Sequence, residues 1–127
     1  MKQAIQVPNA PAPIAPYSPA ILAGNLLFIS GQIPINPDTQ ELVLTDIKAQ
    51  THQVMRNLHA LLVAANADWA NVLKVSIFMT DMQDYAAINE VYGSYFAGIV
   101  PPAREAVQVA ALPRYVNVEI SLIAMIA

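Results

Sequence analysis

Cysteine is absent from this chain of 127 residues, and charged side chains are scarce. Without cysteine the protein can form no disulfide and use no thiolate chemistry, which favours a cytoplasmic location. Lysine and arginine total 6 against 9 aspartate and glutamate, so the net charge of −3 gives no general attraction to nucleic acid. No apolar run approaches the roughly 18 residues of a membrane-spanning helix, and "MKQAIQVPNAPAP" lacks the apolar core of a signal peptide. We therefore expect no nucleic-acid binding, no membrane insertion and no secretion.

Apolar side chains, in contrast, are abundant. Hydrophobic residues make up 56% of the sequence and charged residues 12%, which is apolar for a soluble monomer of this size. A chain of this length is expected to form one domain with one core, so residues 1–127 are treated as a single domain. The apolar surplus predicts that another subunit covers part of the surface.

Local periodicity predicts the order strand, strand, helix, strand, helix, strand, strand. Five of the ten prolines fall in "VPNAPAPIAPYSP", which predicts an extended lead-in that holds Tyr17 in place. The predicted strands are 20–23, 26–31, 71–80, 104–110 and 116–126, the last two paired as a closing hairpin. The first predicted helix has Thr45 as its N-cap and ends near Asn66, and the second runs from about Asp84 to Ala97.

The two helices can cover only one face of the predicted sheet. The second helix is expected to bury one apolar side, made of Tyr85, Ile88, Tyr92, Tyr95 and Phe96. The other face of the sheet is partly apolar and needs a different cover, which oligomerisation would provide.

The closing hairpin carries an unusual pair of charges, Arg104 and Glu119. Alternation along the two strands predicts that both side chains lie on the face away from the helices, and an antiparallel register would bring them close. One interpretation is a partly buried salt bridge at a subunit contact. The other is a functional site in which Arg104 offers a bidentate fork to a ligand carboxylate while Glu119 holds a proton or a water. The pattern alone does not separate the two.

The sequence resembles the RidA/YjgF family of reactive intermediate deaminases in five blocks that follow one another along nearly the whole chain. The blocks are "APYSPAI", "ISGQIP", "DIKAQTHQVMRNL", "VSIFMTDMQDYAAINEVYGSYF" and "PPAREAVQVAALPRYVNVEI". The resemblance implies a chorismate-mutase-like α/β domain, with a mixed sheet and two helices on one face, that forms a homotrimer with three sites between subunits. It also implies cofactor-free hydrolysis of enamines and imines, chiefly 2-aminoacrylate and its imine tautomer, to a 2-keto acid and ammonia.

The resemblance also assigns roles to individual residues. Arg104 would bind the substrate carboxylate, and Glu119 would position or activate the attacking water. Further pocket positions of the family fall on Tyr17, Ser30, Gly31 and Asn89, and on the backbone of Ala106. These residue types suit the chemistry, because an imine carbon is already electrophilic and needs mainly orientation, a water and a proton for the departing nitrogen.

Three features depart from the usual family pattern. The chain has "APYSP" at residues 15–19 where many members have Gly-Pro-Tyr-Ser-Gln, which changes backbone freedom and removes an amide near the pocket. A cysteine that is frequent two residues after the arginine is replaced here by Ala106, which excludes thiol chemistry but keeps a backbone amide. A cation frequent at the closing turn is replaced by Ala111. The preferred imine therefore stays open.

Other site chemistries are less well supported by the sequence. His52 and His59 are seven residues apart, about 10.5 Å along a helix, too far for one metal ion, so no metal site is expected. Ser30 has no nucleophile-elbow context. The alternative to a deaminase is a non-catalytic trimer that binds small carboxylates or protein partners. The presence of both Arg104 and Glu119 favours the enzyme, because a carboxylate binder needs only the arginine.

Overall fold

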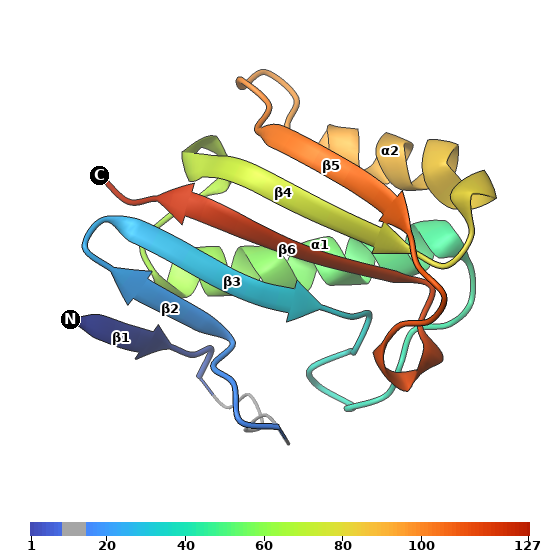
Figure 1. Ribbon diagram of the computed structural model, residues 1–127, viewed down its shortest axis with the longest axis horizontal. Coiled ribbons are helices and arrows are strands. Elements are labelled where there is room, and N and C mark those ends of the chain that lie inside the picture. The colour runs from blue at the N-terminus through green and yellow to red at the C-terminus, as the bar shows by residue number, and fades with distance from the viewer. Residues whose placement is uncertain (9–14) are drawn as a thin grey trace.

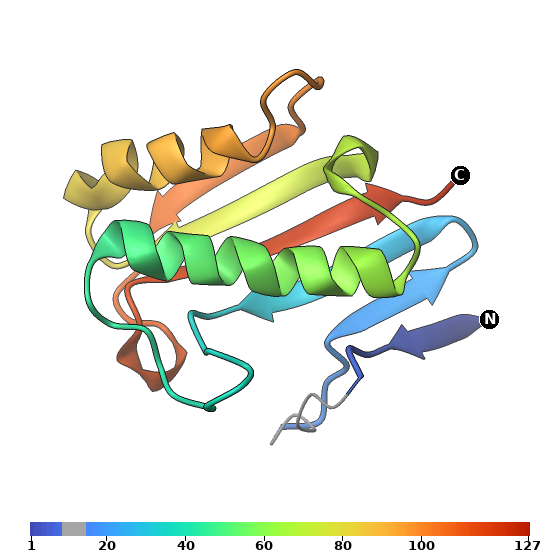
Figure 2. The ribbon, with the colours of Figure 1, turned by 180° about the vertical axis from the view of Figure 1, so that it is seen from behind.

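The computed structural model describes residues 1–8 and 15–127. Within these residues, two helices cover one face of a six-stranded mixed sheet (Figures 1 and 2). The strands are β1 (Lys2–Ile5), β2 (Ala20–Ala23), β3 (Leu26–Gln32), β4 (Val72–Met79), β5 (Ala103–Gln108) and β6 (Val118–Met125), and the helices are α1 (Ile47–Ala64) and α2 (Tyr85–Ser94). Short 3-10 turns occur at η1 (Trp69–Asn71), η2 (Met82–Asp84) and η3 (Pro113–Tyr115). The predicted fold class, a mixed sheet with two helices packed on one face, is confirmed.

The N-terminal part of the sheet contains one strand that the sequence analysis missed. The predicted strands at 20–23 and 26–31 are β2 and β3, joined by a tight turn in which Gly24 has a φ of 60°. β1 then pairs antiparallel with β2, so that Ile5 lies opposite Ala20. Part of the predicted proline-rich lead-in, residues 9–14, lies outside the described residues.

Helix α1 begins one residue later than predicted. The N-cap is Asp46, not Thr45, because the Asp46 carboxylate accepts a hydrogen bond of 2.7 Å from the amide of Ala49. The helix ends at Ala64, and Asn66 then adopts a φ of 60° that turns the chain away. The helix packs one side on the sheet through an apolar set: Val54, Met55, Leu58, Leu61 and Leu62.

Helix α2 is shorter than predicted, and one of its aromatic side chains lies elsewhere. It ends at Ser94, and the chain turns until Gly98, which has a φ of 77°. Ile88, Tyr92 and Phe96 are buried as expected, but Tyr85 is 39% exposed. Tyr85 stands in the first turn of the helix, at the edge of the layer, so its ring is only partly covered.

The predicted closing hairpin is wrong. β5 pairs only with β4, in parallel, and β6 lies between β3 and β4, antiparallel to both. The order across the sheet is β1-β2-β3-β6-β4-β5. The cause is the helix that separates β4 from β5: a strand, helix, strand unit returns the chain in the same direction, so the two strands pair side by side in parallel. β6 is then free to enter the centre, where both of its edges are paired.

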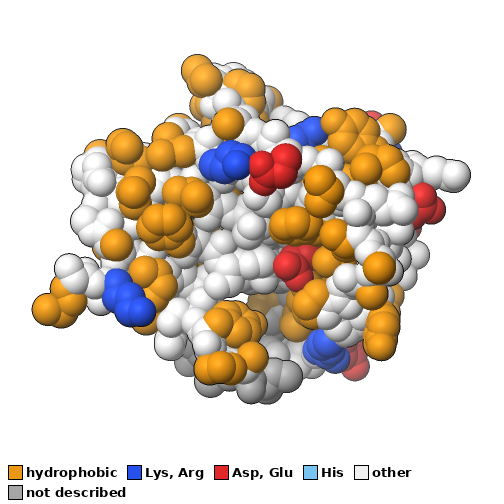
Figure 3. Space-filling model, in the orientation of Figure 1, with side chains coloured by type: hydrophobic (Ala, Val, Ile, Leu, Met, Phe, Trp, Pro, Cys, Tyr) orange, Lys and Arg blue, Asp and Glu red, His pale blue; other side chains and the backbone are white. Residues whose placement is uncertain are grey.

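The two faces of the sheet have different surroundings. On the helix side, Val118, Ile120 and Ala124 of β6 are fully buried, together with Ile77 of β4. The helices leave the other face open (Figures 1 and 2), and apolar side chains gather over it in the space-filling view (Figure 3). They include Phe28, Val107 and Met125, each at least 40% exposed.

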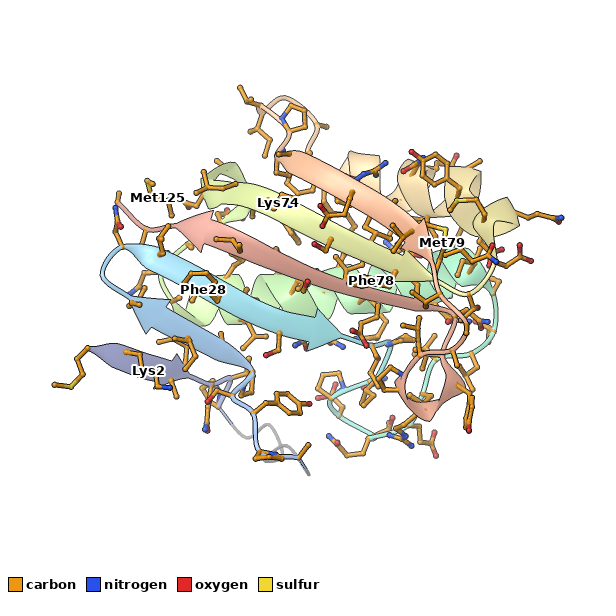
Figure 4. The ribbon with its side chains drawn as sticks, viewed as in Figure 1. Lys2, Phe28, Lys74, Phe78, Met79 and Met125 are labelled. Carbon is orange, nitrogen blue, oxygen red and sulfur yellow. The ribbon has the colours of Figure 1, made fainter. Side chains whose placement is uncertain are left out.

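One polar cluster interrupts the open face. Lys74 forms an ion pair with Glu105 at 2.8 Å, and the Ser76 hydroxyl donates a hydrogen bond to the same carboxylate. In Figure 4, Lys74 lies over β4 while Phe28 and Met125 lie at the β3 and β6 side of the same face. Within residues 1–8 and 15–127, no helix is long and apolar enough to cross a membrane.

Candidate active site

Glu119 points to the open face of the sheet from the central strand β6. Its neighbours Val118 and Ile120 are buried on the helix side, so alternation places the Glu119 side chain on the opposite face, where it pairs across the ladder with Phe78. Partial burial raises the pKa of the Glu119 carboxyl, because the charged form loses hydration. A carboxyl with a raised pKa can take up a proton more readily than an ordinary glutamate at the same pH.

A bulge in β3 brings Gly31 against this carboxyl group. Ile29 pairs with Leu122 and Gln32 with Ile120, so β3 has one residue more than β6 over this stretch. A Cβ atom on Gly31 would lie 2.7 Å from Cδ and 3.0 Å from Cγ of Glu119. Gly31 is therefore needed for close approach to Glu119, and any larger residue would displace the carboxylate.

Ser30, beside Gly31, ties the N-terminal segment to the same place. Its hydroxyl donates a 2.7 Å hydrogen bond to the carbonyl of Ser18, and its amide donates one of 2.9 Å to the carbonyl of Pro19. These bonds hold the segment that carries Tyr17, whose side chain is 54% exposed. The Ser30 hydroxyl thus has a positioning task and is not set up as a nucleophile.

Tyr17, Ser30, Gly31 and Glu119 line one cleft of about 970 Å³. The structure thus brings together four of the seven predicted site residues. The hollow is visible on the open side of the molecule in Figure 3. Among the described residues that line it, only Glu119 and Arg114 carry charge.

Asn57 of α1 holds the far wall of this cleft. Its side-chain amide donates to the carbonyls of Ile33 (3.2 Å) and Ile35 (2.9 Å), and its oxygen accepts from Gln53 at 2.9 Å. The chain that leaves β3 is therefore fixed to the helix, so the cleft is preformed on this side.

The second group of predicted site residues lies on the other face, around Arg104. Arg104 of β5 lies opposite Val75 of β4, and Val75 is buried on the helix side of the sheet. Arg104 therefore also points to the helix side. Its guanidinium Nη1 donates to Asn89 Oδ1 at 2.7 Å, and Nη2 donates to the Tyr85 hydroxyl at 3.0 Å. The guanidinium carbon also lies 5.0 Å from the ring centroid of Tyr92.

These contacts orient Arg104 without neutralising it. Within the described residues it takes part in none of the ion pairs. Its neighbour Tyr92 stays neutral, because burial raises the pKa of that phenol to about 12 despite the nearby positive charge. Three of the five guanidinium N–H donors remain for a ligand, enough for a bidentate carboxylate.

Ala106 lies two residues beyond Arg104 on the outer strand of the sheet. The amide of Val109 donates to the carbonyl of Met79 on β4, at 2.8 Å. Because amide directions alternate along a strand, the amide of Ala106 points away from β4, toward the free edge of β5. The Ala106 amide therefore points to the free edge of the sheet, two residues along β5 from Arg104.

The prediction that Arg104 and Glu119 share one face is wrong within a single chain. The predicted pairing assumed that β5 and β6 were neighbours, but β4 lies between them. Arg104 faces the helices and Glu119 faces the open side. The predicted site residues of one chain therefore form two separated half-sites: one around Arg104, with Asn89 and Ala106, and one around Glu119, with Tyr17, Ser30 and Gly31.

The histidines lie outside both half-sites. His52 Nδ1 is 2.9 Å from the Tyr95 hydroxyl, and His59 Nε2 is 3.1 Å from Asp68 Oδ1. In the described ranges no three histidine, aspartate or glutamate side chains are grouped so as to hold a metal ion.

Comparison with known proteins identifies the family. A family model described as Endoribonuclease L-PSP matches residues 7–126. The chain belongs to this family. It is 54% identical over 124 residues to a RutC family protein of Pyrococcus horikoshii, with 98% of each chain covered. It is 41% identical over 125 residues to the 2-iminobutanoate/2-iminopropanoate deaminase of Mus musculus, covering 98% of this chain and 92% of that protein.

A solved structure of similar sequence has the same fold. The crystal structure of E. coli TdcF with bound serine matches with a TM-score of 0.92 at 38% identity, covering 98% of this chain and 99% of that one. The predicted membership of the RidA/YjgF group is confirmed by the family match and by the deaminase relative.

Sequence reasoning missed two residues of the half-site around Arg104 in this L-PSP family member. Tyr85 and Tyr92 were predicted to be core and interface aromatics, yet both flank the guanidinium. The signal was present: Tyr85, Asn89 and Tyr92 are spaced i, i+4 and i+7, which places them on one face of α2. The parallel pairing of β4 and β5 then sets that face against Arg104.

Proposed function

We propose that this protein is a deaminase that hydrolyses 2-imino acids and their enamine tautomers, such as 2-aminoacrylate, to 2-keto acids and ammonia. The observation that carries the proposal is the pair of half-sites on one chain. One presents an oriented arginine with free donors, and the other presents a desolvated glutamate in a cleft. Together they supply what the hydrolysis of an imino acid needs: an anchor for the carboxylate and a group that exchanges protons with water.

The proposed reaction can be written as a balanced sequence. 2-Aminoacrylate first tautomerises to 2-iminopropanoate, whose carboxylate binds Arg104. Water adds to the imine carbon, and Glu119 takes the proton that the water loses. That proton passes to the nitrogen and completes a neutral carbinolamine. Glu119 then takes the proton of the carbinolamine hydroxyl and delivers it to the amino group, the C–N bond breaks, and ammonia leaves as the carbonyl forms. One water is consumed for each pyruvate and ammonia released, and the sequence uses no metal or cofactor.

Two relatives support this substrate class. The Mus musculus relative is named as a deaminase of 2-iminobutanoate and 2-iminopropanoate. The E. coli neighbour was solved with serine bound, and serine carries a carboxylate next to a nitrogen-bearing carbon, as a 2-imino acid does. A ligand of this kind fits the donors left free on Arg104.

The proposal includes assembly into a homotrimer with the sites between subunits. Arg104 and Glu119 face opposite sides of the sheet, so a complete site needs Arg104 of one copy beside Glu119 of the next. The exposed apolar side chains of the open face, Phe28, Val107 and Met125, offer the surface that such a contact would bury. We place the proposed activity in the cytoplasm.

A coupled assay tests the function directly. An enzyme that releases 2-aminoacrylate is mixed with this protein, and pyruvate formation is followed in the presence of semicarbazide, which competes for the free imine. The proposal expects pyruvate release to become faster in proportion to the protein added, and the semicarbazide adduct to decrease. If the parent protein gives no acceleration over free solution yet binds 2-oxobutanoate, a non-catalytic carboxylate-binding trimer replaces the deaminase.

A further inference from the structure

Tyr85 is the exposed member of the group that surrounds Arg104. Its hydroxyl accepts the 3.0 Å hydrogen bond from Nη2, and its ring centroid lies 5.7 Å from the guanidinium carbon. The side chain is 39% exposed, in contrast to Tyr92, which is 7% exposed. Tyr85 therefore lies at the rim of this half-site, where a ligand would approach Arg104.

The two hydroxyls of this pair have different surroundings. The Tyr92 hydroxyl is buried and forms no hydrogen bond among the described residues. Tyr92 therefore contributes the face of its ring to the arginine and no polar contact. Across residues 1–8 and 15–127, the Tyr85 hydroxyl is the one phenol oxygen that forms a hydrogen bond with the guanidinium.

Two simultaneous hydrogen bonds restrict the guanidinium in a way that one cannot. Asn89 holds Nη1 and Tyr85 holds Nη2, so rotation about the Nε–Cζ bond would break both contacts. If only Asn89 held the guanidinium, the group could still tilt about that one hydrogen bond. The ring of Tyr92 would fix only the distance between the ring and the guanidinium. The direction of the fork decides where a bound carboxylate, and hence the imine carbon, lies relative to the water.

We infer that the Tyr85 hydroxyl is a positioning group, which fixes the orientation of the Arg104 guanidinium and through it the substrate carboxylate. As far as turnover is concerned, this inference rests on the function proposed above. The side chain acts through Arg104 and exchanges no proton with the substrate. The Tyr85 hydroxyl therefore contributes more to the rate of the chemical step than to the affinity for the ligand, because the positive charge of Arg104 is present with or without Tyr85.

Tyr85→Phe tests the inference, because it keeps the ring and removes only the hydroxyl. We expect kcat to fall about three- to tenfold, the effect of losing an ordinary hydrogen bond. The affinity for 2-oxobutanoate should change less than about twofold, since the charge that attracts the carboxylate is kept. Tyr95→Phe, directly after the end of α2, is the matched control: the Tyr95 hydroxyl contacts His52, at 2.9 Å, and not the arginine.

A second readout needs no turnover. The chain has three arginines, and Arg56 and Arg114 are exposed. In side-chain ¹⁵N spectra the two Nη groups of Arg104 should exchange slowly in the parent protein, because rotation about Nε–Cζ is held at both ends. Exchange should become faster in Tyr85→Phe and remain slow in Tyr95→Phe, with Arg56 and Arg114 as internal references for unrestrained rotation.

These measurements separate the inference from the proposed function. Unchanged Arg104 exchange in Tyr85→Phe would overturn the positioning role, whether or not the parent is a deaminase. Equal losses of kcat in Tyr85→Phe and Tyr95→Phe would also overturn it. A parent without deaminase activity but with faster Arg104 exchange in Tyr85→Phe would remove the function and leave the positioning role standing.

Discussion

Arg104 and Glu119 lie on opposite faces of the same sheet, one against the helices and the other on the open side. They are separated by β4 in the order of the strands, so no register of the observed sheet brings them together. A reaction that uses both must take them from different copies of the chain. Two variants that are each inactive should therefore restore activity when they are mixed in one assembly.

Mixed assemblies of Arg104→Ala and Glu119→Gln should regain activity. In the proposed ring of three copies, each site would take its arginine from one subunit and its glutamate from the next. After refolding at a one-to-one ratio, about a quarter of the sites receive both native residues, one half multiplied by one half. The pyruvate assay should therefore recover about a quarter of the parent rate. Mixtures that stay as inactive as each variant alone would show that the two residues do not share a site between subunits.

Gly31→Ala should lower activity far more than stability. The new Cβ would meet Cδ and Cγ of Glu119, and that flexible side chain can move aside at little energetic cost. A carboxylate displaced by about 1 Å is expected to reduce turnover on the order of a hundredfold. Gly93→Ala is the control, because nothing lies within 4 Å of its Cβ position on α2. Gly93→Ala should keep the parent rate, and its free energy of unfolding should rise by about 0.5 to 1 kcal/mol. Kinetics of Gly31→Ala equal to those of the parent would mean that the position of the Glu119 carboxylate is unimportant.

Glu119→Gln should reduce turnover by roughly 100- to 10,000-fold, the usual effect of losing a general acid or base. It should also change how stability depends on pH. Burial raises the Glu119 pKa above 4.5, so between 4.5 and the raised value the folded protein binds more protons than the unfolded chain. The free energy of unfolding therefore falls as pH rises through this window, and stays lower above it.

The glutamine variant lacks this titration. Its free energy of unfolding should fall less over the mildly acidic range than that of the parent, and at pH 7 it should be at least as stable. Urea unfolding at a series of pH values measures both quantities. Both proteins carry Arg104→Ala, so that no neighbouring arginine offsets the effect of burial on Glu119, and protein concentration is held constant because assembly contributes to stability. A steeper fall in the glutamine variant than in the parent would contradict the desolvation of Glu119.

Asp46→Ala should lower the free energy of unfolding by about 1 kcal/mol, because it removes the carboxylate that caps the Ala49 amide at the start of α1. Thr45→Ala should have little effect, since the cap lies at the following residue. Urea denaturation at one protein concentration compares the two variants. Equal losses of unfolding free energy in the two variants would contradict the assignment of the N-cap to Asp46 rather than Thr45.

The sequence predicted the local elements of this fold better than their pairing. β2, β3, β4 and α1 were found within a few residues, because alternation, helical spacing and turn residues act over short distances. The closing hairpin was wrong because two consecutive strands are usual neighbours, and the chain pattern does not show that β6 would enter between β3 and β4. The strand, helix, strand order of β4, α2 and β5 did contain the signal for parallel pairing, and it was not used.

The residues of the candidate site could be predicted from the sequence, but their arrangement in space could not. The charges of the closing segment singled out Arg104 and Glu119, the resemblance assigned their roles, and composition suggested a covered sheet face. The separation of these residues onto opposite faces could not be derived, since it depends on long-range register. The role of Gly31 also depends on tertiary structure: the bulge in β3 and the close approach to Glu119 exist only once β6 is in place. Tyr85 was assigned to the core because helical spacing gives the face of a residue but not its distance from the edge of the layer.

The central place of β6 has a consequence for how the chain is made. β6 leaves the ribosome after the five other described strands, yet it joins β3 to β4 across the middle of the sheet. Until it arrives, the nascent chain holds two incomplete sheets, each with an unpaired inner edge and with apolar residues that lack their partners. Such edges favour association with other chains. We therefore expect the nascent protein to rely on chaperones until β6 has emerged, and chains that terminate before Val118 to aggregate, although they contain both helices and four-fifths of the apolar core.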